Sequence, residues 1–342
     1  MSAKGGLQVD YAPLAERDPA RWDGLLGVVT FDEPPPALNG TDVPVAEIRT
    51  PVLEGSSDIC EIWRTARRVE SGQRARVRYR RDENVLFGCI EVPEIDSPAD
   101  GTRTALHAAT EEAYREIFSV LDAVGYGHLL RVWNYMPGIN ADSFGTERYW
   151  QFNKARREAL MACGRDVTGN VPAACALGSA GGPVVIYFLA SRSAPLVIEN
   201  PRQVSAYQYP PKYGPRPVFA RASVLQDSAA TMLFISGTAS IVGHETFHIG
   251  DVGAQTRESL ANIEALLGEA NRVAGAARFA LGSLAYKVYV RHSTDLPVIR
   301  AQVTSTVGSR AQVVYLKADI CRQNLLVEIE ATGGNPASNG EA

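Results

Sequence analysis

Two stretches of the chain have apolar residues spaced as in β-strands and amphipathic helices. In the first stretch, the alternating runs VRYRR and VLFGCIEV precede a helical stripe over Thr104–Val124, and the apolar run HLLRVWNYMP follows it. The second stretch has a strand pattern at Met232–Ser236, a helical stripe at Val252–Ala270 and a strand pattern at Ala285–Arg291. Because periods of two and of about 3.6 residues mark strands and amphipathic helices, the order strand, helix, strand is predicted twice.

The two stretches also match each other in sequence. The triplet Thr110-Glu-Glu corresponds to Thr256-Arg-Glu, and RVWNY at 131–135 corresponds to KVYVR at 287–291. Such a repeat is typical of a diverged tandem duplication. We therefore predict an α+β fold of two tandem units, with helices packed on one face of mixed sheets. The units are expected at 71–195 and 196–332, after an irregular N-terminal wrapping segment (1–70) and before a disordered tail (333–342).

Composition narrows the classes of partner. A chain of 342 residues with 45% hydrophobic content can fill two cores, and a net charge of −4 without a long basic block argues against nucleic acid. No stretch reaches 18 apolar residues and the N-terminus lacks an apolar signal region, so we expect a soluble, cytoplasmic protein without a membrane partner. Five scattered cysteines without a CxxC motif argue against disulfides and a thiolate zinc site.

Two motifs resemble cofactor sites but lack the necessary context. His244-Glu-Thr-Phe-His248 spells the zinc-protease motif HExxH, which needs both imidazoles on one helical face. Two glycines follow within five residues, so no helix can carry the motif. We therefore predict a polar loop that leads to a helix capped by Asp251. The glycine-rich run 178–182 precedes an apolar strand instead of a helix, which favours a tight turn over a phosphate loop. We predict no metal and no cofactor.

The last apolar strand pattern carries two carboxylates on one face. In Leu325–Ala331, alternation places Glu328 and Glu330 opposite Val327. Burial of a carboxyl group in a central strand would raise its pKa and make it a usable general acid near neutrality. The alternative is that both glutamates edge a wet pocket or pair with arginines. The pattern leaves both possibilities open.

Cationic and thiol side chains are further candidates. A planar guanidinium suits bidentate binding of a carboxylate, although any one such residue is more often a solvated surface charge. The cations are Arg148 beside Tyr149, Arg221 after Tyr209 and Tyr213, Arg310, and Lys317. Cys321 falls in a predicted hairpin loop between strands Ala311–Ala318 and Leu325–Ala331, where a lone cysteine is often only a small hydrophobe.

The C-terminal stretch, about residues 221–331, resembles RidA/YjgF proteins. The resemblance rests on FISG, on DVGAQTRESLANIEALL and on SRAQV followed by LVEIEA. It implies two RidA-like (chorismate mutase-like) units, with Arg310 holding a substrate carboxylate and Glu328 as the acid. Units of this kind trimerise, but a tandem copy could satisfy some interfaces within one chain. The expected state is therefore a monomer or a RidA-like homo-oligomer.

Three further segments extend the resemblance to the chorismatase/hydroxybenzoate synthase family. They are NYMPGIN (134–140), GTERYWQFNKAR (145–156) and YQYPPKYGPRPVFARAS (207–223). Members of this family convert chorismate to pyruvate and a hydroxybenzoate or a dihydroxycyclohexadienoate without a cofactor. The resemblance implies that Glu328 protonates the enolpyruvyl methylene and that the cations bind the two carboxylates of chorismate. The tyrosines at 149, 209 and 213 would pack on the ring.

Two positions distinguish subtypes of this family. Gly237, in a predicted strand-end turn, and Cys321 resemble the pair found in members that form 3-hydroxybenzoate, whereas hydrolytic members have Ala at the turn. In the former route the ring 4-hydroxyl displaces pyruvate through an arene-oxide-like intermediate. The resemblance implies that Gly237 would leave room for the ring and that Cys321 would assist opening of the intermediate. Some relatives also release 4-hydroxybenzoate. The alternatives are a hydrolytic chorismatase, a RidA-type deaminase of enamines or imines, and a non-catalytic binding module.

Overall fold

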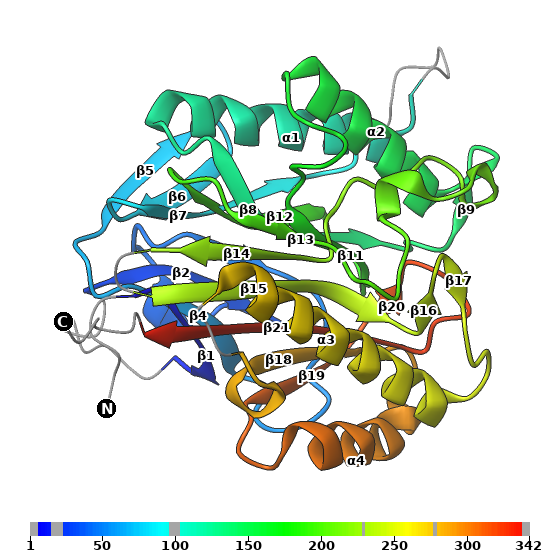
Figure 1. Cartoon of the computed structure of the whole chain (residues 1–342). Coiled ribbons are helices and arrows are strands. Elements are labelled where there is room, and N and C mark those ends of the chain that lie inside the picture. Colours follow the sequence, from blue (N-terminus) through cyan, green and yellow to red (C-terminus); the bar gives the residue numbers. More distant parts are fainter. Residues whose placement is uncertain (1–5, 15–22, 96–102, 228–229, 276–278, 337–342) are drawn as a thin grey trace.

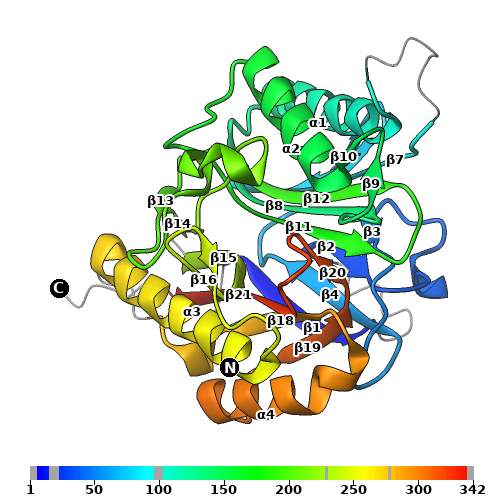
Figure 2. The ribbon, with the colours of Figure 1, turned by 90° about the vertical axis from the view of Figure 1, so that its right-hand side faces the viewer.

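The computed structural model describes residues 6–14, 23–95, 103–227, 230–275 and 279–336 (Figure 1). These residues form three large β-sheets, two two-stranded sheets and four α-helices. Helices α1 and α2 lie on one outer side of the molecule and α3 and α4 on another, with the sheets between them (Figure 2). None of the described helices is both long and apolar enough to cross a membrane.

The first unit is a seven-stranded sheet in the order β5-β6-β7-β12-β8-β11-β20. Its strands are β5 (Glu70–Arg74), β6 (Val77–Arg81), β7 (Val85–Val92), β8 (His128–Pro137), β11 (Ala173–Ser179), β12 (Val184–Ser191) and β20 (Asp319–Ile320). Its helices are α1 (Ala105–Val124) and α2 (Arg148–Ala162). Apolar residues of both helices pack on one face of this sheet, among them Ile117 and Phe152. Thr104 caps α1 by accepting a hydrogen bond from the His107 amide, as expected at a helix start.

The second unit repeats the first. Its six-stranded sheet has the order β13-β14-β15-β21-β18-β19. The strands are β13 (Leu196–Ile198), β14 (Ala222–Gln226), β15 (Ala230–Ala239), β18 (Ala285–Val290), β19 (Val313–Lys317) and β21 (Val327–Pro336), and the helices are α3 (Val252–Ala274) and α4 (Leu296–Val307). In both units four antiparallel pairings are followed by one parallel pairing, β8 with β11 and β18 with β19. The predicted fold class, two tandem α+β units with helices on one face of mixed sheets, is confirmed.

Several details of the predicted organisation need correction. The first seventy residues are not an irregular wrapping segment, because they form a sheet, β1-β4-β2-β3, of Gln8–Pro13, Ile59–Arg64, Leu25–Thr30 and Val45–Glu47. Strands β19 and β21 do not form a hairpin, since β18 lies between them. The predicted tail at 333–342 begins inside β21, which continues to Pro336 and pairs with β15, while residues 337–342 lie outside the described part.

All three large sheets turn one face toward a shared core. Phe31 and Trp63 enter it from the N-terminal sheet, Trp133 and Tyr187 from the first unit, and Tyr289 from the second. The Trp133 and Tyr187 rings stack with centroids 4.5 Å apart. The N-terminal sheet therefore covers the inner faces of the two units, which would otherwise expose these aromatic rings to water.

A fully buried ion cluster crosses this core. The Lys287 ammonium lies 2.6 Å from a Glu61 carboxylate oxygen and 2.8 Å from one of Glu330, and Arg131 lies 2.6 Å from the other Glu330 oxygen. Trp133 donates a further hydrogen bond to Glu330 at 2.7 Å. Burial opposes ionisation of Glu330, but Lys287 and Arg131 outweigh it and hold its pKa below its usual value. The cluster ties the N-terminal sheet to both units.

Removal of Lys287 is expected to destabilise the protein strongly. Lys287→Met leaves Glu61 and Glu330 buried without their shared cation, and loss of one partner of a buried pair costs about 3–5 kcal/mol. Urea denaturation measures this change in the free energy of unfolding. Lys317→Met is the matched control, because Lys317 is exposed on the neighbouring strand β19, where a change within about 0.5 kcal/mol is expected. Equal stabilities of the two variants would contradict a structural role of the cluster.

Candidate active site

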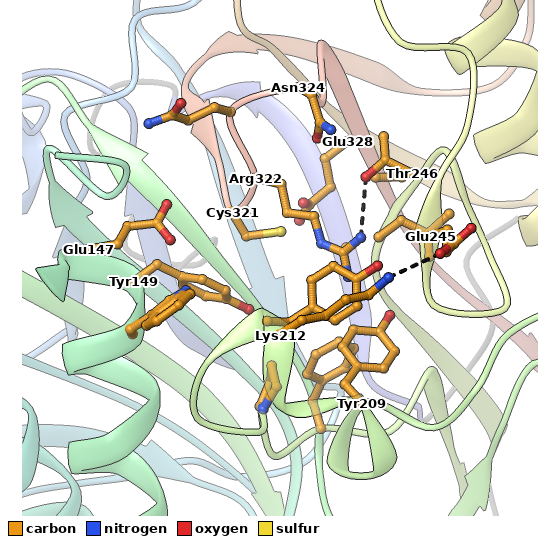
Figure 3. Close-up of a pocket in the computed structure, with 18 of the residues that line it drawn as sticks. Glu147, Tyr149, Tyr209, Lys212, Glu245, Thr246, Cys321, Arg322, Asn324 and Glu328 are labelled. Carbon is orange, nitrogen blue, oxygen red and sulfur yellow. Dashed lines mark hydrogen bonds and ion pairs between the residues drawn. The ribbon is translucent and has the colours of Figure 1, made fainter. Parts of the chain in front are cut away.

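A cavity of about 800 Å³ opens where the two units meet. The first unit contributes the hairpin β9–β10 (Asp142–Ser143 and Thr146–Glu147) and the start of α2, and the second contributes β15, β21 and the hairpin β16–β17 (Ile241–Val242 and Glu245–Thr246). The loop between β20 and β21 supplies Cys321 and Arg322 to its wall (Figure 3). Since β20 pairs with β11 of the first unit and β21 belongs to the second, this loop bridges the units at the cavity.

Glu328 on β21 presents a carboxyl group to this cavity. Among the described residues its carboxyl has no hydrogen-bond or ion-pair partner, in contrast to Glu330 two residues further along the strand. Burial, reinforced by the negative charge of Glu330, raises the pKa of Glu328 to about 8. Glu328 is therefore protonated at neutral pH and can donate a proton to a molecule in the cavity.

Gly237 lies against this carboxyl group. The structure places it within β15 at a register shift between Ile235 and Thr238, not in the predicted strand-end turn. A Cβ atom at this position would stand 1.8 Å from Oε1 of Glu328 and 3.1 Å from Cβ of Cys175. The space that the glycine leaves open is therefore filled by the acid, whereas the resemblance implied that it would make room for a substrate ring.

Two arginines that line the cavity have N–H donors without a hydrogen-bond partner among the described residues. Arg221 donates to the Val204 carbonyl at 2.8 Å and to the Tyr209 hydroxyl at 2.7 Å, and its buried Nε has no partner among the described residues. Arg322 donates to the Thr246 hydroxyl at 3.2 Å, and one of its terminal nitrogens is likewise buried without a partner in the described chain. Buried unpaired donors of this kind favour an anionic ligand.

The other predicted cations lie elsewhere. Arg148 pairs with Glu94 and donates to the Pro137 carbonyl at 3.0 Å, beside a different hollow. Arg310 lines a separate cavity next to the N-terminal strand β1, and Lys317 is exposed on β19. The structure therefore does not bring these three residues to Glu328. Arg310 and Lys317 flank β19, which β18 separates from β21, and Arg148 at the start of α2 is held by Glu94. Arg322, which sequence reasoning missed, supplies a cation here, and no pattern in the sequence around it indicated this.

The predicted tyrosines do come together at the cavity. Tyr149 lies at the start of α2, and Tyr209 and Tyr213 follow in the segment before β14, with their two rings 5.7 Å apart. The Arg322 guanidinium lies 4.2 Å from the centre of the Tyr213 ring. These rings give the cavity an apolar side next to its two cations.

Cys321 also faces the cavity, held there by Arg291 at the end of β18. Burial, aided by the nearby Glu328, raises the pKa of the Cys321 thiol to about 12, so the sulfur is a neutral thiol. The Arg291 guanidinium donates to the carbonyls of Ile320 at 2.9 Å, Arg322 at 3.0 Å and Leu325 at 2.7 Å. This one side chain, also missed from the sequence, fixes the loop that carries Cys321 and Arg322.

The HExxH segment forms the loop that the sequence predicted. Glu245 belongs to the short strand β17 and His248 has a left-handed backbone (φ 56°), so no helix carries the motif. Asp251 caps α3 by accepting a hydrogen bond from the Ala254 amide at 2.9 Å, as expected. In the described ranges, no group of three His, Cys, Asp or Glu side chains is placed to hold a metal ion. The glycine-rich run 178–182 connects β11 to β12 and is the expected turn.

Comparisons with known proteins agree with this architecture. The family model "Chorismatase FkbO/Hyg5-like, N-terminal" matches residues 61–190. A 3-hydroxybenzoate synthase of Streptomyces hygroscopicus is 40% identical over 319 residues, which cover 90% of each chain. A chorismatase of Streptomyces rapamycinicus is 41% identical over 295 residues, covering 84% of this chain and 85% of that one. A chorismatase crystal structure superimposes with a TM-score of 0.84 at 33% identity, covering 97% of this chain and 100% of that chain.

The duplicated fold and these relatives define an enzyme whose two α+β units share one cavity. Coverage of 90% of the chain at 40% identity settles the family. The chain belongs to the chorismatase family.

Proposed function

We propose that this enzyme converts chorismate to pyruvate and 3-hydroxybenzoate, as the name of its relative from Streptomyces hygroscopicus suggests. One observation carries the proposal: a protonated carboxyl group, Glu328, shares a cavity with two arginines that each have a buried N–H donor without a partner among the described residues. Chorismate has two carboxylates and an enol ether that needs a proton. The cavity therefore offers a cation for each carboxylate and an acid for the ether.

Binding of chorismate would use the polar groups of the cavity that have no partner among the described residues. The free N–H groups of Arg221 and Arg322 would each bind a carboxylate, and the hydrogen bonds that already hold these guanidinium groups keep them oriented. The tyrosine rings would pack against the carbocycle. Arg148, Arg310 and Lys317 have no place in this proposal.

The chemistry begins with Glu328. Its proton passes to the methylene carbon of the enolpyruvyl group, which turns the ether into an oxocarbenium-like leaving group. The ring 4-hydroxyl oxygen then displaces pyruvate from ring carbon 3 and forms an arene oxide. Opening of the oxide and loss of a ring proton give the aromatic acid, so chorismate and the two products contain the same atoms and no water is consumed.

The decisive experiment is incubation of the purified enzyme with chorismate, followed by measurement of pyruvate and chromatography of the organic acids. Pyruvate with an equal amount of 3-hydroxybenzoate is the expected result, and a 4-hydroxybenzoate peak would mark a mixed-product enzyme. Pyruvate with a dihydroxycyclohexadienoate would reassign the chain to the hydrolytic branch. Absence of pyruvate would overturn the proposal in favour of a RidA-type deaminase or a binding module.

Cys321→Ala is expected to slow hydroxybenzoate formation by about tenfold or more while KM for chorismate changes little. The neutral thiol faces the cavity and can relay a proton during opening of the oxide, but it carries no charge that would hold a carboxylate. Steady-state kinetics with chromatography of products measures both quantities. An unchanged rate and product profile would remove Cys321 from the reaction, and a tenfold rise in KM alone would make it a binding residue.

A further inference from the structure

The cavity contains a second carboxyl group that the proposed chemistry has not used. Glu147 is the last residue of β10 and immediately precedes α2, yet its side chain makes no hydrogen bond that caps this helix. It turns into the cavity instead (Figure 3). No ion pair reaches its carboxylate within the described residues, and its hydrogen bond comes from the Asn140 amide at 3.4 Å. A half-buried carboxylate without a cation is costly unless the site uses it.

The other acidic side chains that line the cavity are in different situations. Glu245 pairs with Lys212 at 3.1 Å, and both are exposed at the rim. Asp142 is exposed. Glu328 is the proton donor. Glu147 is thus the lining carboxylate that is both partly buried and available to accept a proton.

Asn140 fixes the orientation of Glu147. The Asn140 side-chain oxygen accepts a hydrogen bond from Arg291 at 3.1 Å, so its amide nitrogen is directed to Glu147. Arg291 is the residue that also holds the Cys321 loop. One arginine therefore sets both the loop with Cys321 and, through Asn140, the carboxylate of Glu147. Figure 3 shows Glu147 beside Tyr149, with Cys321 next to them and Glu328 further along the wall.

We propose that Glu147 is the general base that accepts the proton of the ring 4-hydroxyl when its oxygen displaces pyruvate. This inference rests on the proposed function. The hydroxyl oxygen forms a bond to ring carbon 3, the bond from that carbon to the enolpyruvyl oxygen breaks, and its electron pair stays on the oxygen that becomes the pyruvate carbonyl. The hydroxyl proton moves to Glu147. When the oxide opens, Glu147 returns this proton to the oxygen, and the ring proton lost on aromatisation goes to the Glu328 carboxylate, which restores the starting state.

The electrostatic setting of Glu147 fits this role. Burial raises the pKa of its carboxyl above the usual value, and Asp142 adds to the effect, while the hydrogen bond from Asn140 opposes it. A carboxylate in such surroundings is a stronger base than an exposed one. The acid and the base also come from different units. Glu328 belongs to the second unit and Glu147 to the first.

The test compares Glu147→Gln with the parent enzyme, using chorismate and product chromatography. The glutamine keeps the size and the Asn140 contact but cannot take the proton, so hydroxybenzoate formation is expected to fall by about 100-fold with KM within threefold of the parent. Residual pyruvate should then be accompanied by dihydroxycyclohexadienoate, because water competes with an unactivated hydroxyl. Asn140→Ala, which frees Glu147 without removing it, is expected to give an intermediate loss.

Glu245→Gln is the matched control, since it alters a carboxylate of the same cavity that is paired at the rim, and its rate should stay within twofold of the parent. A Glu147→Gln variant that forms hydroxybenzoate within a fewfold of the parent rate would overturn the assignment. Thermal melts of each variant show whether slow turnover results from loss of the base or from loss of folding. A variant that is folded, binds chorismate and turns over slowly supports the role of Glu147 as the base. A parent that releases no pyruvate would instead overturn the proposed function itself.

Discussion

Glu328→Gln is expected to lower chorismate turnover by about 1,000-fold or more while chorismate still binds. The carboxyl of Glu328 is the protonated acid in the cavity, and the glutamine amide has nearly the same size but no acidic proton. The arginines that bind the substrate are untouched, so affinity should change little. Pyruvate release measures turnover, and isothermal titration with chorismate measures binding to the inactive variant. Activity equal to the parent would remove Glu328 from the mechanism.

The pH dependence of the parent enzyme provides an independent check on the same residue. The proton donor is the neutral carboxyl, which is populated below its pKa of about 8 and is lost as pH rises through that value. The value of kcat should therefore be highest below about pH 8 and should fall tenfold per pH unit above it. The small residual rate of Glu328→Gln should lack this alkaline limb. A parent profile that rises through pH 8 would mean that the group acts as a base.

The two glutamates of β21 show how far the sequence could lead. Alternation correctly placed Glu328 and Glu330 on one face, and it left open whether they are buried acids or ion-pair partners. The structure realises both alternatives, one at each residue. Glu330 is held by Lys287 and Arg131, whereas Glu328 meets the cavity. Which glutamate takes which role depends on residues about 40 and 200 positions away, since Lys287 and Arg131 reach Glu330 only in the folded protein.

The cations and the N-terminal sheet could not be predicted for related reasons. Arg148 adjoins an aromatic pair in the sequence, but its partner Glu94 comes from the end of another strand. Arg322 becomes a cavity residue only because β20 pairs with the first unit and carries the following loop across. In the N-terminal sheet β1-β4-β2-β3, two of the three pairings, β1 with β4 and β4 with β2, join strands that are not consecutive in sequence. Periodicity reports local structure and carries no information on such contacts.

The two units differ at the position of the acid. Glu328 on β21 pairs with Tyr289 on β18, and the equivalent pair in the first unit is Tyr187 on β12 with Trp133 on β8. An aromatic ring therefore occupies the position of the acid, and it stacks in the core with Trp133 instead of facing a cavity. The first unit has Tyr187 at the position of the acid and, in the proposed mechanism, supplies Glu147 and Tyr149 to the site of the second.

Gly237→Ala is expected to reduce hydroxybenzoate formation by about 100-fold, and mainly through kcat. The added Cβ would lie 1.8 Å from Oε1 of Glu328, so the carboxyl must move away from its present position. The atom in the way is the end of a flexible side chain, so the fold should persist and the acid should be misplaced. If the glycine served only to make room for the substrate ring, KM would rise instead while kcat stayed near the parent value. Steady-state kinetics with chorismate separates these two outcomes.

The ratio of products formed by Gly237→Ala is a second measurement of the position of the acid. A displaced carboxyl should protonate the enol ether less effectively and leave the leaving group exposed to water, so the residual pyruvate should be accompanied by dihydroxycyclohexadienoate. Gly268→Ala is the matched control, because Gly268 lies in α3 and a Cβ atom added there would meet no atom within 4 Å apart from its own neighbours in the helix. Alanine also favours helix over glycine by up to about 1 kcal/mol. That variant should be as active as the parent and at least as stable. A Gly237→Ala enzyme with parental kcat and product ratio would mean that Glu328 does not act from the position it holds here.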